Sequence, residues 1–132
     1  MSDLRALIES GLVDKEDGTI FDVNTNLLWQ KSPSDKRFTW KEANKYCESL
    51  TLAGYNDWRL PTVEELESLI NNKYKPTTDP ILKCKLSYYW SSSTHVLGPG
   101  YAWIVHFYDG FVFHDSKGYA FSVRAVRGKH NV

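Results

Sequence analysis

Residues that could act as metal ligands, nucleophiles or acid–base groups are few and widely spaced in this sequence. The histidines and cysteines, which supply most such groups, are His95, His106, His114, His130, Cys47 and Cys84. The cysteines do not have the short spacing of a zinc site, and the histidines are scattered. Motifs for a serine nucleophile, a phosphate-binding glycine loop and a His-Glu-x-x-His helix are absent. The sequence therefore predicts a non-catalytic protein that has no metal and no cofactor.

A predicted hairpin gives a geometric test for two of the histidines. Asp109-Gly110 is a strong signal for a two-residue β-turn between two strands. Such a turn would pair Tyr108 with Phe111. His106 and His114 would then lie on opposite faces of the hairpin and could not share a metal ion.

The same register assigns the apolar side chains of the hairpin to two faces. One face holds Trp103, Val105, Phe107, Val112 and His114. The other face holds Ile104, His106, Tyr108, Phe111 and Phe113. The first composition is typical of a core. The second mixes aromatic rings with polar tips and suits a recognition surface or a subunit contact, unless helices cover it and the hairpin is a two-sided core element.

A candidate recognition surface follows from the hairpin and from the loop at 93–100 that precedes it. Tyrosine and histidine combine a rigid apolar body with a polar tip, which favours contact at a low entropy cost. The candidate ligand-binding residues are His95, Tyr101, His106, Tyr108, Phe111, His114 and Lys117. The alternative is that the loop is plain surface and that the rings belong to the core.

The charge balance and the N-terminus restrict the partners. The chain has 16 Lys and Arg against 16 Asp and Glu, so its formal net charge is zero and gives no support for a nucleic acid partner. The sequence shows no secretory signal and no apolar run that could insert into a membrane. We therefore expect a cytoplasmic protein, or a secreted one if a longer precursor precedes this chain.

Helix signals and strand signals fall in separate parts of the chain. Capping boxes that start at Thr39 and Thr62 predict helices over 40–52 and 63–71. The predicted strands are 19–21, 27–30, 88–92, 101–108, 111–114 and 119–127. The fold class is therefore α+β, with two helices on a small antiparallel sheet in which the first and last strands meet.

Residues 1–16 form a separate lead-in. Leu4, Leu7, Ile8 and Leu12 repeat at helical spacing, which predicts a short amphipathic helix. This helix could pack on the domain or make the protein a homo-oligomer.

The stretch between the two predicted helices is the most specific part of the sequence. Arg59 lies between Trp58 and Leu60, and Pro61 follows, just before the second capping box. An arginine between two large apolar residues predicts a planar guanidinium held inside the fold by carbonyls or a carboxylate. The alternative is an exposed arginine that binds an anion.

These residues also carry a family resemblance. Trp-Arg-Leu-Pro-Thr at 58–62, followed by Glu65-Leu66, is similar to the signature of the bacterial Lcl C-terminal domain family. Further matching stretches, in the same order, are 17–20 with 28–30, 39–43 with Cys47, 89–94 and 123–127. The resemblance covers 17–128 and leaves 129–132 as a tail. The residues it marks as a structural signature are Trp29, Trp40, Trp58, Arg59, Pro61, Trp90, Arg124 and Arg127.

The resemblance implies a fold similar to C-type lectins and to formylglycine-generating enzymes, and a role in binding glycans or other macromolecules. A lectin-type calcium site is not expected, because residues 98–101 carry no acidic ligand. Many relatives have a cysteine where this chain has Ala125, so a bridge from Cys47 to the last strand is excluded. Free thiols at Cys47 and Cys84 are predicted, with a bond between them as the alternative.

Three functions remain as hypotheses. The first is a binding module for a glycan or a protein, and this is the function the sequence favours. The second is an intracellular oligomeric interaction protein, for example in a phage- or defence-related system. The third is an enzyme of the formylglycine-generating type, which the wide separation of Cys47 and Cys84 disfavours.

Overall fold

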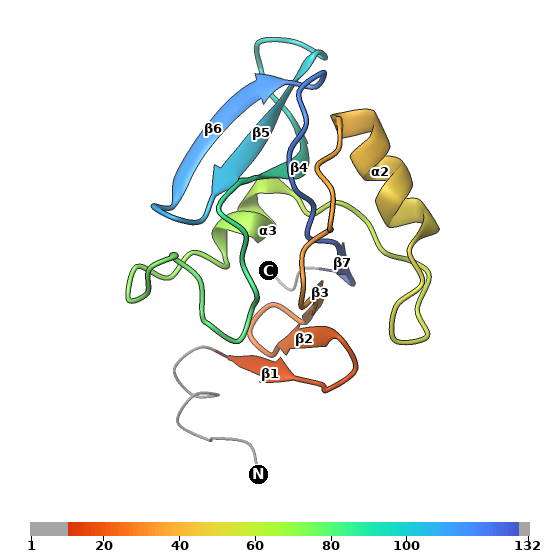
Figure 1. The fold of residues 1–132 in the computed structure, drawn as a ribbon, viewed down its shortest axis with the longest axis vertical. Coiled ribbons are helices and arrows are strands. Elements are labelled where there is room, and N and C mark those ends of the chain that lie inside the picture. The colour runs from red at the N-terminus through yellow and green to blue at the C-terminus, as the bar shows by residue number, and fades with distance from the viewer. Residues whose placement is uncertain (1–10, 130–132) are drawn as a thin grey trace.

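The computed structural model describes residues 11–129, which form two helices and two small antiparallel sheets, so the predicted α+β class is confirmed (Figure 1). The elements in chain order are β1 (Leu12–Asp14), β2 (Thr19–Asp22), β3 (Leu27–Gln30), α2 (Trp40–Ser49), α3 (Val63–Glu67), β4 (Tyr88–Thr94), β5 (Tyr101–His106), β6 (Phe111–Ser116) and β7 (Val126–Arg127). In Figure 1 the two sheets lie at opposite ends of the molecule, with α3 between them and α2 along one side.

The predicted N-terminal helix falls largely on residues 1–10, which lie outside the described residues. Its last expected member, Leu12, is not helical but begins β1, which pairs with β2. Gly11 has a φ of +73°, and its carbonyl accepts the N–H of Val23. Sheet pairing therefore replaces helical hydrogen bonds at this point.

The first sheet has the strand order β1-β2-β3-β7. As predicted, an early strand meets the last one, with Leu28 opposite Arg127 and Trp29 opposite Val126. Side chains alternate across the sheet, so Leu28 and Arg127 share one face while Trp29 lies in the core on the other.

The second sheet has the order β4-β5-β6, and its hairpin differs from the predicted one. His106 pairs with Phe111, so the connection has four residues, 107–110, rather than two. Thr77 donates both its N–H and its hydroxyl to the carbonyl of Phe107, whose side chain is 1% exposed. This contact with a distant loop draws Phe107 out of the ladder and into the core.

The predicted assignment of faces holds, because the register shifts by two residues and two is the side-chain period of a strand. Val105 and Phe107 are buried, as expected of the first face. The second face is divided. Ile104 is 1% exposed, whereas Phe111 and Phe113 on the edge strand are 62% and 52% exposed. The second face is therefore core at β5 and open at β6.

Both helices begin at the predicted capping boxes, with Thr39 and Thr62 as N-caps. They are shorter than predicted, because α2 ends at Ser49 and α3 at Glu67. After Glu67 the backbone bonds change to the i→i+3 pattern, so the chain continues as turns.

The long last strand predicted at 119–127 is wrong, since only Val126–Arg127 form β7. The preceding residues change partner from one position to the next. Phe121 bridges to Phe38, and Ser122 bridges to β4. A segment that bonds to several neighbours in turn cannot form one continuous ladder.

Candidate functional site

One group of predicted binding residues gathers where the second sheet meets the loop after β4. The His95 and His114 rings stack with 4.0 Å between centroids, and the edge of Tyr101 approaches His114 at 6.3 Å. Trp103, which the sequence assigned to the core face, is half-buried and lies 4.3 Å from His95. Three of the seven candidate residues are thus brought together, with Trp103 as an additional member.

His95 is not the exposed contact residue that the sequence suggested. Its side chain is 9% exposed, and its Nδ1 accepts the N–H of Leu97 at 3.1 Å. Burial lowers the pKa of His95, and the neighbouring His114 lowers it further. The ring therefore fastens the loop to the sheet in its neutral form.

A second group lies on the other face of the hairpin, towards its turn. His106 contacts the ring of Tyr88 edge-on at 4.8 Å and pairs with Phe111 across the ladder. Phe111, Phe113 and Tyr108 are 62%, 52% and 50% exposed. We call Tyr108, Phe111 and Phe113 the hairpin patch.

Lys117 belongs to neither group. Its ammonium lies 3.9 Å from the ring centroid of Trp40 and donates to the Thr94 hydroxyl at 3.0 Å. These contacts give Lys117 a local packing role. The seven candidate residues therefore occupy three places and do not form one site.

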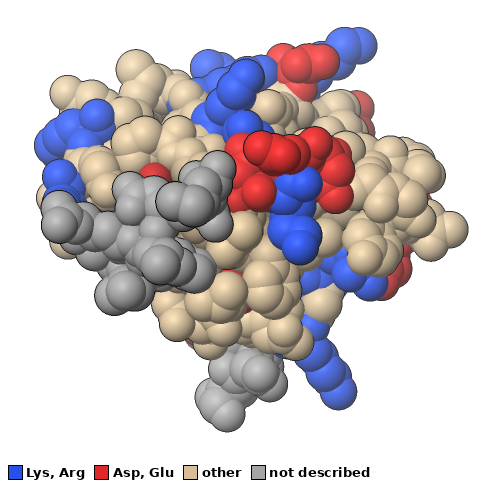
Figure 2. All heavy atoms as spheres, turned by 90° about the horizontal axis from the view of Figure 1, so that it is seen from below, with Lys and Arg blue, Asp and Glu red and all other residues tan. Residues whose placement is uncertain are grey.

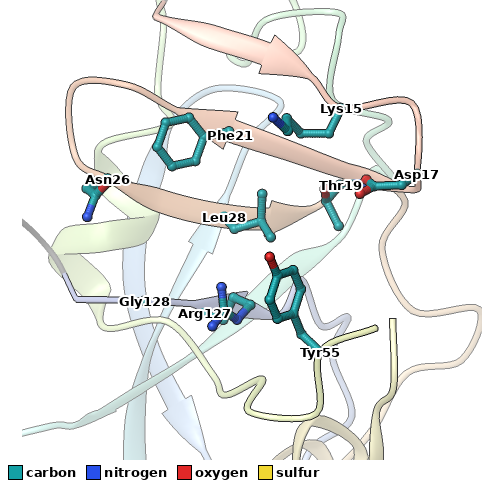
Figure 3. A pocket seen from close by; sticks show the side chains of 9 residues that line it. All are labelled: Lys15, Asp17, Thr19, Phe21, Asn26, Leu28, Tyr55, Arg127 and Gly128. Carbon is teal, nitrogen blue, oxygen red and sulfur yellow. Dashed lines mark hydrogen bonds between the residues drawn. The ribbon is translucent and has the colours of Figure 1, made fainter. Parts of the chain in front are cut away.

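A cleft of about 370 Å³ opens between the first sheet and the loop that follows α2 (Figure 3). Phe21 and Leu28 are a cross-strand pair on its floor, and Arg127 continues the same row on β7. Tyr55 projects from the loop onto Arg127, whose guanidinium carbon is 3.8 Å from the ring centroid.

Polar groups surround this floor. Lys15 and Asp17 come from the turn between β1 and β2, and Asn26 from the turn between β2 and β3. Asp17 Oδ1 accepts the N–H and the hydroxyl of Thr19. Within residues 11–129, no ionic or hydrogen-bond partner contacts the Lys15 ammonium.

The charge of Arg127 is already balanced by an ion pair. Its Nε donates to Asp57 Oδ1 at 2.6 Å and its Nη2 to Oδ2 at 3.0 Å. The hydrogen bonds from Arg127 lower the pKa of Asp57, so the pair is ionised at neutral pH. Sequence reasoning missed the cleft, although Arg127 lies in a stretch that matches the family signature and Tyr55 and Asp57 come just before the stretch at 58–62.

Arg59 makes the contacts expected of a structural guanidinium. It forms two hydrogen bonds with Glu65, at 2.8 and 2.9 Å, and donates to the carbonyl of Gly128 at 2.8 Å. Burial acts to raise the pKa of Glu65, but hydrogen bonds from Arg59 and Thr62 outweigh it and hold the pKa below its usual value. The anion-binding alternative loses its support, because both terminal nitrogens of the guanidinium already donate to the Glu65 carboxylate.

Arg124, unlike the partly exposed Arg59, is almost fully buried, at 1% exposed. Its guanidinium donates to the carbonyls of Gln30 and Lys31, each at 2.7 Å, and to that of Lys83. It therefore joins β3, the loop between α3 and β4, and the C-terminal segment just before β7.

The remaining signature residues are also structural. Trp29, Trp58, Pro61 and Trp90 are buried, and the Trp40 indole donates to the carbonyl of Ser91 at 3.0 Å.

Both cysteines are free in the structure, as predicted. Cys47 is 1% exposed, and burial raises the pKa of its thiol to about 12. Across residues 11–129 no three His, Cys, Asp or Glu side chains are grouped so that they could hold a metal ion. No helix in that range has the length and apolarity needed to cross a membrane.

A known protein family matches most of the chain. The profile of the Lcl C-terminal domain matches residues 18–127. Among the described residues, this range contains every helix and strand except β1. The chain belongs to the Lcl C-terminal domain family. A comparison with curated proteins finds no match.

Proposed function

We propose that this member of the Lcl C-terminal domain family is a non-catalytic binding module that contacts a protein partner through the hairpin patch. The observation that carries the proposal is the exposure of its three aromatic side chains, each of which is at least 50% accessible. Large rings that contribute little to a core are typical of binding surfaces.

The position of the patch supports a protein partner. Phe111 and Phe113 belong to β6, which is an edge of the second sheet. Within the described residues no strand pairs with the outer side of β6. An edge strand with exposed aromatic residues can accept both side-chain packing and backbone hydrogen bonds from another chain.

The chemistry of the patch favours a protein over a glycan. Two of the three rings are phenylalanines, which have no polar tip to bond sugar hydroxyls. The Lys75 ammonium lies 5.1 Å from the Tyr108 ring centroid. The patch therefore offers apolar contact area with few directed polar groups, which suits the centre of a protein interface.

The test replaces the patch and leaves the core intact. The variant is Phe111→Ala with Phe113→Ala, and the matched control is Tyr119→Ala, whose ring is 60% exposed on a different turn. Immobilised wild type and control should retain the same protein partner, identified by mass spectrometry, and the double variant should lose it.

Four results would overturn the proposal. If the double variant retains every partner, the patch is not the contact surface. If its melting temperature falls by several degrees, the rings are core residues. If sedimentation shows a wild-type oligomer that the double variant dissociates, or a glycan array gives a signal that depends on the patch, the partner is a second copy or a glycan.

A further inference from the structure

We propose that the outer edge of β6 binds an extended segment of another protein, which adds to the second sheet as an antiparallel strand. This inference rests on the proposed function and deepens it, because it names the form of the partner and the main-chain groups that hold it. In Figure 1, β6 is the outermost strand of the second sheet, beside β5.

Hydrogen bonds within the sheet determine which main-chain groups of β6 point outward. Lys117 donates its N–H to the carbonyl of Gly100 at 2.8 Å, so these residues form a hydrogen-bonded pair at one end of the β5–β6 ladder. Such pairs alternate with non-bonded pairs along an antiparallel ladder. Counted back from Lys117, the non-bonded positions include those of His114 and Val112, whose N–H and C=O groups therefore point away from β5.

The bonds of β4 lead to the same assignment independently. Trp90 donates its N–H to the carbonyl of Ser122, on the side of β4 that faces away from β5. Its neighbour Tyr89 therefore faces β5 and bonds Val105 across the ladder. The main-chain groups of Val105 then point away from β6, so those of its β6 partner Val112 point outward.

Four main-chain groups at this edge are therefore open, namely the N–H and C=O of Val112 and of His114. Among residues 11–129 no hydrogen bond is formed to any of these four groups. The edge closes beyond them, because the Ser116 N–H donates to Asp115 Oδ1 at 2.7 Å and its carbonyl accepts the N–H of Tyr119 at 3.1 Å. Donors and acceptors that recur every second residue match the main chain of another extended segment.

A second copy of this chain fits the edge poorly. Two β6 strands can exchange bonds only where an outward residue faces an outward residue, so all four groups are used only if Val112 pairs with His114 of the second copy. That register sets Phe111, whose side chain is 62% exposed, opposite Asp115 of the second copy. Registers centred on Val112 or on His114 would use only one of the two outward residues in each copy. The partner is therefore a different chain.

The side chains of β6 indicate the sequence of that segment. Phe111, Phe113 and Asp115 project to one face, as alternate residues of a strand do. An antiparallel partner places its first residue opposite Asp115 and then, at intervals of two, residues opposite Phe113 and Phe111. Opposite charges and apolar pairs stabilise such cross-strand contacts. The segment therefore has the pattern basic-x-apolar-x-apolar, and its x residues bond His114 and Val112.

Charge contributes little else at this edge. Residues 111–114 contain no Asp, Glu, Lys or Arg. The end of the molecule that carries the first sheet differs, because acidic and basic side chains are interspersed there, as Figure 2 shows. Recognition at β6 therefore depends mainly on main-chain bonds and apolar contacts, with one charge at Asp115.

The experiment titrates a synthetic peptide into the isotope-labelled full chain and follows amide signals and amide hydrogen exchange by NMR. The probe is acetyl-Ser-Lys-Thr-Val-Thr-Ile-Ser-amide, which carries the pattern. It should bind with a millimolar or tighter Kd and slow exchange of the Val112 and His114 amides about tenfold. The Phe113 amide, which already bonds within the sheet, should change less. Replacing the peptide lysine with glutamate should weaken binding about threefold.

N-Methylation of the peptide separates main-chain pairing from side-chain contact. Methylating both threonine nitrogens removes the donors that face β6 and should weaken binding about tenfold. Methylating the valine and isoleucine nitrogens, which point to solvent, is the matched control and should have less than about a third of that effect. In the protein, Val112→Pro removes an outward N–H at a position where an edge strand tolerates proline. It should bind about tenfold more weakly than Val112→Ala, which keeps the N–H.

The proposal fails if the unmodified peptide does not bind folded wild type at millimolar concentration, or if the threonine-methylated peptide binds equally well. These peptide measurements decide it even if Val112→Pro does not fold. Binding that needs Phe111 and Phe113 but not the threonine N–H groups would overturn strand addition and leave the proposed aromatic protein contact standing. A wild-type dimer that protects the Val112 and His114 amides without peptide would assign the edge to a second copy and overturn the proposal.

Discussion

Replacing Arg59 with lysine tests the central structural contact of the family signature. Arg59 holds both oxygens of Glu65 and the carbonyl of Gly128 with one planar group. A lysine ammonium keeps the charge but cannot reach the three acceptors in that geometry. The variant should therefore fold with lower stability.

The structure sets the size of this loss. The Glu65 side chain is 4% exposed, so a lost partner leaves a buried carboxylate oxygen less well bonded. The Arg59 side chain is 39% exposed, so water can replace part of the hydrogen bonding that its guanidinium gives to Glu65. The net cost should be about 1–2 kcal/mol, which lowers the melting temperature by roughly 3–12 °C in a domain of this size.

The assay is urea unfolding followed by tryptophan fluorescence, with Arg37→Lys as the matched control at an exposed arginine. The control should change the free energy of unfolding by less than about 0.5 kcal/mol. Glu65→Gln and the double variant complete a cycle that isolates the pair. If Arg59→Lys is as stable as the control, the structural role is refuted. A loss of binding at unchanged stability would instead support an anion site.

The pH dependence gives the same test a second measurement. In the folded chain the pKa of Glu65 lies below 4.5. The ionised carboxylate therefore adds to the free energy of unfolding above pH 4.5, and this stabilisation is lost as the pH falls further. Wild type should therefore lose more stability than Arg59→Lys on acidification from pH 5 towards pH 3.

Three further predictions follow from buried groups. Arg124→Lys should cost about 2–4 kcal/mol in urea unfolding, since the guanidinium bonds three carbonyls inside the fold, and a cost below 1 kcal/mol would contradict that role. Both thiols should react with a chromogenic disulfide reagent in denaturant. In native protein the half-buried Cys84 should react first and Cys47 only on unfolding, whereas equal native rates would mean that Cys47 is not buried. Because the folded pKa of His95 is lowered, wild type should lose stability as pH falls below about 6.5, and His95→Gln should lose less; equal losses would show that His95 does not titrate with unfolding.

The sequence determined the features that depend on near neighbours. Thr39 and Thr62 cap their helices because each meets a glutamate three residues later, within reach in any helix start. The faces of the hairpin follow from strand periodicity, and they survive the wrong register for the same reason.

Distant contacts decided the features that the sequence did not determine. The hairpin turn lengthens because Thr77, from another loop, bonds the carbonyl of Phe107. His95 looks like a surface residue in the sequence, and it is buried because His114 and Trp103 stack against it from neighbouring strands. Contacts of this kind, between residues far apart in the chain, have no signal in the local sequence.

The cleft depends most fully on tertiary structure. Its walls come from the β1–β2 turn, the loop after α2 and the last strand, and the Asp57–Arg127 pair joins positions 70 residues apart. The residue types at 58–62 and 123–127 match the family signature, but composition alone could not show that these two segments of the chain meet. Chain folding brings them together because β7 completes the first sheet beside β3, which places Arg127 under Tyr55.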